Sequence, residues 1–351
     1  MITSDRFIRE NGKKIDVLKL ALAILVVGIH TTKVGFVLRP IFRISVPTFF
    51  IISSYLFFSK QATLTSFVER KRALMKYVKR IMVLYLFWFV ALFPLTAHYR
   101  QWFDDFSLNT LLEIIKGFFF GSTFMASWFL MASVIGVIIV WYLREKNVRN
   151  VWLLIGGVVI YCLCCLTSTY DSLCMRLSGF ENAYQSYYSI FRAPFTSFPC
   201  ALLFVAIGKI LAEQKLYFPD KLLLSVMVLS LVTLYCEYWF TSSCCKVVND
   251  DCYFSLPILC TCLFMMVGQS SPMKSHYDTR QLRAYSTIIY CSHLTIAKVL
   301  YTLFEKIIID TKGPLFITLL FVTTLTIALL LSWAILKLER YKHLKWLWFA
   351  H

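Results

Sequence analysis

Apolar runs long enough to cross a lipid bilayer follow one another along almost the whole chain. A helix needs about 20 apolar residues to span a hydrocarbon core of about 30 Å. Ten runs approach that length, and 254–268 is the shortest: 15–34, 41–58, 77–97, 124–143, 151–168, 193–212, 221–240, 254–268, 284–304 and 314–337. This pattern predicts an all-α polytopic integral membrane protein with about ten transmembrane helices, forming a single membrane-embedded domain over residues 1–351.

The composition supports the same fold class. Of the 351 residues, 59% are hydrophobic and 16% are charged, whereas soluble domains carry about 45–50% apolar and about 25% charged residues. The polar and basic first fourteen residues lead into an apolar run that no small-residue cleavage site follows, so we expect a retained first span. The stretch 108–121 is interrupted by Glu113 and Lys116 and is expected to be an interfacial or re-entrant piece.

The net charge of +17 is distributed between the apolar runs rather than gathered in one basic domain. This distribution argues against nucleic acid as a partner and is typical of membrane topology and of contact with anionic lipid headgroups. Lys and Arg concentrate in the segments around 6–14, 60–80, 144–149, 209–221, 274–283 and 337–345. We therefore expect both termini in the cytoplasm, loops 98–117, 169–191 and 241–253 outside, and a multi-pass location in the cell inner membrane.

The twelve cysteines do not indicate a metal site. Most lie within apolar runs, where a thiol behaves as a small hydrophobe, and their spacing fits no zinc pattern. Cys244, Cys245 and Cys252 share one polar loop and are candidates for a disulfide if that loop is extracytoplasmic. No metal and no permanently bound cofactor are expected.

The first apolar run carries three ionisable residues, Asp16, Lys19 and His30. At 100° per residue they fall on one helix face, and Lys19 and His30 are separated by a rise of about 16 Å. Ionisable residues inside a span are costly and mark candidate functional sites. Two structural interpretations compete with this one: Lys19 extending to the headgroups beside Asp16, and His30 as a hydrogen-bonded core histidine.

Four segments in order carry a family resemblance. Lys19-x10-His30 resembles the basic-x10-His motif of acyltransferase-3 proteins, and the segment from Arg43 to Phe58, RISVPTFFIISSYLFF, is similar to that family's Val-Pro-x-Phe-Phe and Ser-Gly-Tyr segment. SWFLMASVIGVII and YSTIIYCSHLTI resemble its Trp-Phe-Leu and Ile-Tyr-x-x-His segments. Ser54 departs from the pattern by replacing the usual Gly, and the family's Arg-x-x-Arg is only approximated by Lys76, Lys79 and Arg80.

The resemblance implies a membrane O-acyltransferase. Such a protein moves an acyl group, commonly acetyl from acetyl-CoA, from the cytoplasm to a hydroxyl of an envelope or extracellular glycan or of a glycolipid. His30 would be the general base or the acyl carrier, supported by Asp16 and Lys19. Cations at Lys76, Lys79 and Arg80 would bind the phosphates of the acyl-CoA donor, although positive-inside topology also explains them.

Further residues are candidates for acceptor binding or support. Arg43 would stabilise developing negative charge or bind an acidic acceptor, or would serve only as an interfacial anchor. Ser53 and Tyr55 are typical of hydrogen bonds between helices, and Trp128 of packing or the aromatic belt. His293 lies within a span as a second catalytic candidate, with a structural hydrogen bond as the alternative. The outer segment 169–191 is acidic and aromatic, which suits carbohydrate stacking or an interfacial cap.

Two other functional classes remain open. A transporter or flippase for a small metabolite or a lipid-linked sugar would also need many spans and buried polar groups. Corresponding helix breaks in two halves are typical of transporters, and the prolines within the runs show no such pairing. The third possibility is a sensory or resistance-linked membrane domain that binds an amino acid without catalysis.

Overall fold

The computed structural model describes residues 4–351 except 33–35, 103, 105–106, 125, 215, 246–248, 271–277 and 308–312, with backbone alone over 4–11. Every regular element in this part of the chain is helical. The longer helices are α1 (Ser4–Thr31), α3 (Ser45–Gln61), α4 (Phe67–Tyr99), α5 (Leu108–Phe120), α6 (Trp128–Glu145), α7 (Asn150–Thr167), α9 (Ser178–Phe191), α10 (Phe198–Gln214), α11 (Asp220–Cys244), α12 (Leu256–Gln269), α13 (Arg280–Phe304) and α14 (Pro314–Leu338). Short turns are α2 (Arg39–Phe42), α8 (Asp171–Cys174), η1 (Pro194–Thr196) and η2 (Lys342–Ala350).

Each of the ten predicted runs coincides with a helix, and the all-α membrane fold is confirmed. Among the described residues, seven helices are long and apolar enough to span a bilayer, or eight if a bent pair counts as one span. The bent pair joins α9 and η1 to α10 at 44°, so the predicted run 193–212 is broken near its start, after the 3-10 turn that begins at Pro194. The count of ten spans stays a prediction.

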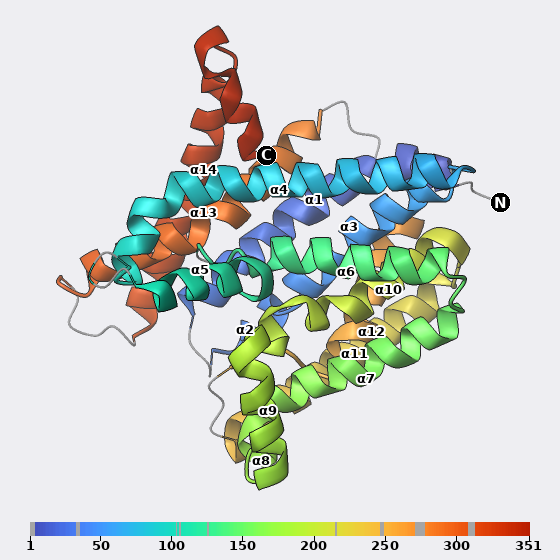
Figure 1. Cartoon of the computed structure of the whole chain (residues 1–351), viewed down its shortest axis with the longest axis horizontal. Helices are drawn as coiled ribbons and strands as arrows, with labels where there is room; N and C mark the ends of the chain where they lie inside the picture. The colour runs from blue at the N-terminus through green and yellow to red at the C-terminus, as the bar shows by residue number, and fades with distance from the viewer. Residues whose placement is uncertain are drawn as a thin grey trace.

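The helices of the bundle run in roughly one direction, along the horizontal of Figure 1. In the same view α14 and η2 project above α4, while α8 and α9 project below α7 (Figure 1). Helix α5 is short and strongly amphipathic in sequence, with Gly117 as its only buried residue. A helix with one buried position contributes little to the core, and the interfacial or re-entrant placement of 108–121 stays a prediction.

The core is built on α3 and α10, whose backbones approach closely at Gly208. A Cβ added to Gly208 would lie 2.0 Å from Ser54 Oγ and 2.7 Å from the Ile51 carbonyl oxygen. Ser54 in turn donates to the Phe50 carbonyl oxygen of its own helix at 2.7 Å, so its hydroxyl is satisfied. Helices α6 and α7 pack against the other faces of α10, and α1 and α12 pack against α3.

The connections gather at two ends of the bundle. At one end Lys14 Nζ donates to Ser270 Oγ at 2.6 Å, and Arg70 of α4 forms a salt bridge with Glu145 of α6 at 2.8 Å. At the other end the loop after α11 contacts the residues after α7, with Ser168 Oγ donating to the Asn249 carbonyl oxygen at 3.1 Å. Segments predicted on one side of the membrane therefore lie together, while which side is cytoplasmic stays a prediction.

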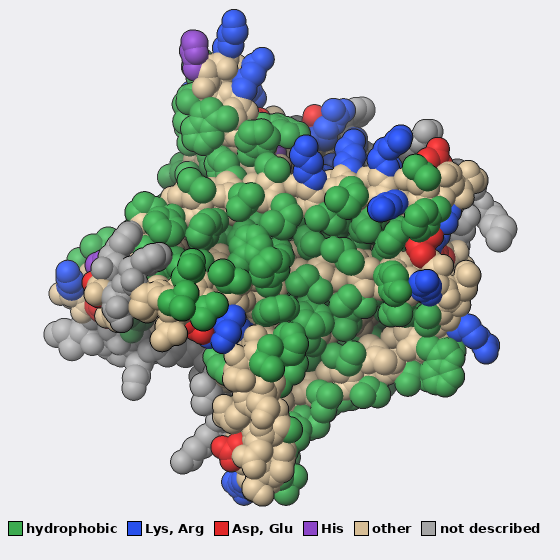
Figure 2. Space-filling view, viewed as in Figure 1, with side chains coloured by type: hydrophobic (Ala, Val, Ile, Leu, Met, Phe, Trp, Pro, Cys, Tyr) green, Lys and Arg blue, Asp and Glu red, His purple; other side chains and the backbone are tan. Residues whose placement is uncertain are grey.

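The surface agrees with a lipid environment. Hydrophobic side chains cover the middle of the face shown in Figure 2, over α4, α6 and α7, and Lys and Arg gather along the first half of α4 and at the right-hand end. Large exposed apolar residues include Val90, Ile138, Val159 and Leu229. An exposed apolar band with basic residues at one end is the arrangement that a bilayer stabilises.

Candidate active site

Helix α1 is held in place by polar contacts with α13. Asp16 accepts hydrogen bonds from Arg283 Nε at 3.1 Å and from Thr279 Oγ1 at 3.2 Å. Ser286 Oγ donates to the Lys19 carbonyl oxygen at 3.0 Å. Asp16, expected beside Lys19 on its own helix, thus joins two helices and orients the face that carries His30.

His30 faces His293 of α13, and the two ring centroids are 5.2 Å apart. The His30 side chain is exposed, whereas His293 is fully buried. Nδ1 of His293 lies 2.8 Å from the Tyr290 carbonyl oxygen and 3.1 Å from that of Ile289. Because carbonyls only accept, this nitrogen carries the proton in the neutral ring, and Nε2 keeps a lone pair.

Neither imidazole has its full set of hydrogen bonds. Nε2 of His293 is buried without a partner, and His30 has no hydrogen bond to any described residue. An accessible imidazole without a protein partner is free to take a proton from a bound hydroxyl. The sequence expectation of a structural hydrogen bond for His293 is met at Nδ1, yet its other nitrogen is available.

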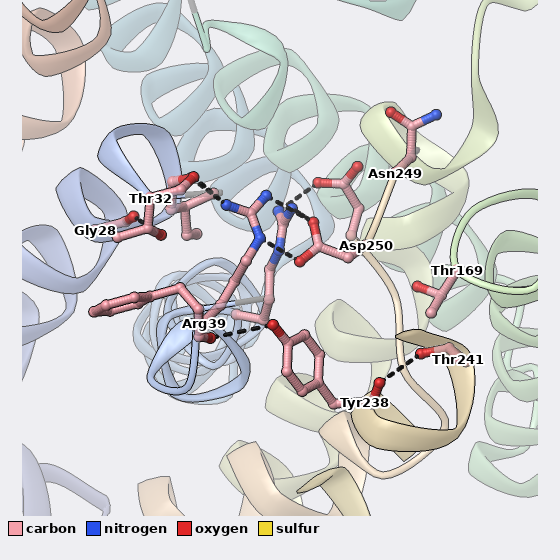
Figure 3. Close-up of polar contacts among 12 residues, drawn as sticks. Gly28, Thr32, Arg39, Thr169, Tyr238, Thr241, Asn249 and Asp250 are labelled. Carbon is pink, nitrogen blue, oxygen red and sulfur yellow. Dashed lines mark hydrogen bonds and ion pairs between the residues drawn. The ribbon is translucent and has the colours of Figure 1, made fainter. Parts of the chain in front are cut away.

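A buried cluster of two arginines and two aspartates adjoins His30. Arg39 binds Asp250 through Nε at 2.5 Å and Nη2 at 2.8 Å (Figure 3). Arg43 binds both Asp250 and Asp251. Arg39 Nη1 also donates to the carbonyl oxygens of Ile29 at 3.0 Å and Thr32 at 2.5 Å, at the end of α1. The cluster therefore fixes the backbone on both sides of His30.

The pKa values of the two aspartates of this cluster are shifted in opposite directions. Burial raises the pKa of Asp250, but the charges and hydrogen bonds of Arg43 and Arg39 outweigh it and hold that pKa well below its usual range. For Asp251, burial and then the neighbouring charge of Asp250 outweigh the attraction of Arg43, and the pKa is raised. Asp250 is thus the permanent countercharge of the two guanidinium groups.

This pairing changes the expected role of Arg43. Its side chain is 9% exposed and both carboxylates occupy it, so it is not a free binder of an acidic acceptor. The Arg43 charge still lies near the His30 imidazole, as do His293, Arg39 and Asp250. Arg43 is placed to orient the site rather than to capture an anion.

The opposite end of α1 faces a basic cavity. Lys19 lies among the charges of Arg283, Asp16 and Arg80. A cavity of about 280 Å³ adjoins this cluster and is lined by Arg80, Arg280, Arg283, Glu339, Trp348 and His351, among others. Of the three cations expected to bind the donor, Arg80 lines the cavity, whereas Lys76 and Lys79 are exposed and are not among its lining residues.

The other supporting candidates pack between helices. Ser53 Oγ lies 3.2 Å from the Tyr77 hydroxyl, which joins α3 to α4. The buried ring of Tyr55 packs against Phe264 at 5.0 Å, and Trp128, at the start of α6, packs against Phe50 at 6.0 Å. The Ser53 contact fits the expected hydrogen bond between helices, whereas Tyr55 contacts the neighbouring helix by ring packing.

The cysteines are free thiols in the described part of the chain. Cys252 Sγ lies 3.7 Å from Cys200 Sγ of α10, while Cys244 is exposed. The contact of this loop thiol is therefore with α10 rather than with Cys244 or Cys245. Among the described residues no group of three or more His, Cys, Asp or Glu side chains is arranged to hold a metal ion.

Sequence reasoning missed Arg39, Asp250, Arg280 and Arg283. Asp250 lies 211 residues from Arg39 along the chain, so no local spacing links them. One signal was present: Arg39 and Arg43 are four residues apart on one helical face, and Asp250 and Asp251 are adjacent acids in a short polar loop. Two close cations at the edge of a span require a countercharge from elsewhere.

Comparison with known proteins places this geometry in context. A family profile described as an acyltransferase domain matches residues 13–333. An amino-acid racemase of Enterococcus faecalis is 25% identical over 343 residues, covering 92% of this chain and 46% of that protein. A serine/alanine racemase of Enterococcus gallinarum is 23% identical over 292 residues, covering 80% of this chain and 40% of that protein. The chain spans less than half the length of these curated relatives, and no solved structure matches it.

Proposed function

We propose, because this chain belongs to the acyltransferase-3 family of membrane acyltransferases, that it transfers an acyl group from cytoplasmic acyl-CoA to a hydroxyl of an envelope glycan. Acetyl-CoA is the proposed donor and the cell inner membrane the proposed location. The observation that carries the proposal is the accessible imidazole of His30, which has no hydrogen-bond partner among the described residues. Its ring centroid lies 5.2 Å from that of the buried His293. Proton transfer by an imidazole is the chemistry that hydroxyl acylation requires.

The proposed step is a direct transfer. The acceptor hydroxyl oxygen bonds to the thioester carbonyl carbon while a ring nitrogen of His30 takes the hydroxyl proton. The carbon–sulfur bond then breaks, the acyl group remains on the acceptor oxygen as an ester, and the proton passes to the departing thiolate of coenzyme A. In the carrier version His30 itself is acylated first and then deacylated by the hydroxyl. His293, whose Nε2 has no hydrogen-bond partner among the described residues, is the neighbouring imidazole in either course.

The donor is proposed to enter at the Lys19 end. The cavity there presents the guanidinium groups of Arg80, Arg280 and Arg283, which suit phosphate oxygens, and the indole of Trp348, which suits an aromatic base. The rise between Lys19 and His30 is about 16 Å. The acyl-bearing arm of the donor must extend over a comparable distance along α1 to bring its thioester to His30.

The names of the relatives favour a second candidate. Both matched relatives are named as amino-acid racemases and are more than twice the length of the matched region. The corresponding hypothesis is a membrane domain that binds or moves an amino acid without acyl transfer. A transporter or flippase belongs to the same non-catalytic class and would leave acetyl-CoA intact.

Purified protein in lipid nanodiscs tests the proposal by release of free coenzyme A from acetyl-CoA, with and without an envelope glycan extract. His30→Gln and His30→Ala should both lose about 10²–10⁴-fold in rate, because neither side chain takes a proton. His98→Gln, at an exposed histidine of α4, is the matched control and should keep full activity. Near-normal transfer by His30→Gln would move the catalytic role to His293, and no consumption of acetyl-CoA by the native protein would sink the proposed function.

A further inference from the structure

A second cavity, of about 480 Å³, lies between α9 and the loop that joins α11 to α12. It is lined by Tyr184, Gln185 and Tyr188 of α9, by Phe195, and by Asn249 and Asp251 of the loop, among others. Helix α9 has no buried residue and projects from the bundle next to α8 (Figure 1). The catalytic proposal above gives this cavity no role.

The cavity lies next to the His30 site. Asp251, which lines it, accepts a hydrogen bond from Arg43 Nη1 at 2.6 Å. The adjacent Asp250 binds Arg39, which bonds the backbone flanking His30 (Figure 3). The contacts of Arg43 and Arg39 therefore link the lining of this cavity to the backbone beside His30, at the end of α1 opposite the basic cavity.

The lining has the chemistry of a carbohydrate site. Tyr184 and Tyr188 are four residues apart on α9, their ring centroids are 6.0 Å apart, and both line the cavity, so one ligand can contact two aromatic side chains. Gln185, Asn249 and Asp251 add amide and carboxylate groups that bond hydroxyls. Specific sites combine apolar or aromatic walls with a few polar groups that fix orientation.

The charge of the lining selects against anions. Among the described lining residues there is no lysine, arginine or histidine, and Asp251 supplies a carboxylate. An acidic sugar would therefore find no cation in the described lining to bind its carboxylate. A cationic ligand would gain little, because Arg43 already compensates the charge of Asp251.

We propose that this cavity binds an uncharged pyranose ring of the acceptor, next to the ring whose hydroxyl reaches His30. This proposal rests on the proposed function, since it assigns the acceptor as a neutral glycan of more than one sugar. Binding two adjacent rings separately explains how one hydroxyl is presented to His30, because the ring in the cavity fixes the position of its neighbour.

Saturation-transfer NMR on the full-length protein in nanodiscs free of glycoside detergents tests the binding without donor or catalysis. The probes are the methyl glycosides of glucose, galactose, mannose and N-acetylglucosamine, with methyl glucuronide as the anionic counterpart. At least one neutral glycoside should bind, and the glucuronide should bind at least about tenfold more weakly, a difference of about 1.4 kcal/mol. The combined Tyr184→Ala and Tyr188→Ala variant should weaken neutral binding about tenfold or more.

Two further variants keep the test independent of folding. Tyr188→Phe retains the aromatic face and should bind within about threefold of the native protein, a change below about 1 kcal/mol. Tyr217→Ala, at an exposed tyrosine before α11, is the matched control and should leave binding unchanged. The proposal is overturned if none of the four neutral glycosides binds, if the glucuronide binds equally well, or if the double tyrosine variant binds as the native protein does. If the native protein binds a neutral glycoside but transfers no acyl group, the result counts against the proposed function and not against the sugar site.

Discussion

Removal of the Asp250 carboxylate is expected to destabilise the protein strongly. Asp250 is 0% exposed and accepts hydrogen bonds from both Arg39 and Arg43, which are each 8% exposed. In Asp250→Ala, Arg39 loses its carboxylate partner and Arg43 keeps only Asp251. Breaking a buried ion pair by removing one partner costs about 3–5 kcal/mol of unfolding free energy, because the remaining charge is buried without compensation.

Thermal unfolding of the purified protein in one detergent measures this effect. Asp220→Ala is the matched control, since Asp220 is exposed in the first turn of α11 and its loss is expected to cost about 0.3–1 kcal/mol. Asp250→Asn keeps the shape and one acceptor but not the charge, so its melting temperature should fall between those of the two alanine variants. Acyl transfer should fall with stability in Asp250→Ala, because Arg39 also fixes the carbonyls of Ile29 and Thr32 beside His30.

Comparison with Asp220→Ala separates the loss of a buried countercharge from the loss of any one carboxylate. If Asp250→Ala melts at the same temperature as Asp220→Ala, the cluster is not the countercharge that the geometry indicates. An Asp250→Asn variant that melts as low as Asp250→Ala would mean that charge, rather than shape, accounts for the whole effect.

Three further outcomes are expected. The pKa of Asp250 is depressed on folding, so the unfolded state binds more protons than the folded state below about pH 4, and stability should fall on acidification there. Asp250→Ala should lack this part of the acid dependence in a pH series of melting curves. Arg80→Gln should raise the apparent KM for acetyl-CoA more than it lowers kcat, whereas Lys79→Gln, outside the cavity, should leave donor kinetics unchanged. Gly208→Ala should cost about 1–3 kcal/mol in thermal unfolding, since the added Cβ would meet Ser54 Oγ, and an unchanged melting temperature would contradict the close α3–α10 approach.

The fold was largely predictable because the bilayer imposes a length scale on the sequence. Each apolar run had to form a helix whose backbone groups bond internally. The structure departs from the predicted spans at a turn that begins with proline and in a helix that carries charged residues. The run 193–212 is broken after the 3-10 turn that begins at Pro194. Helix α1, with Asp16 and Lys19, is not among the helices that are apolar enough by composition to count as spans.

The candidate site was predictable only along one helix. Helical geometry placed Asp16, Lys19 and His30 on one face. In the structure each of them contacts α13, through the Asp16 carboxylate, the Lys19 carbonyl oxygen and the His30 ring. Contacts between distant segments were not predictable, because periodicity says nothing of which helices pack together. The pairing of Arg43 with Asp250 is such a contact, and it replaces the expected free cation with a compensated one.

The same cluster has a consequence for synthesis of the protein. Arg43 leaves the ribosome 207 residues before Asp250. At about 5–20 residues per second, the two arginines wait about 10–40 s for their countercharge. During that interval the segment after α1 holds two uncompensated guanidinium groups at the membrane boundary. We therefore expect the packing of α1 against α3 to become final only after α11 has been translated, so that the His30 site is completed late in synthesis rather than on insertion of α1.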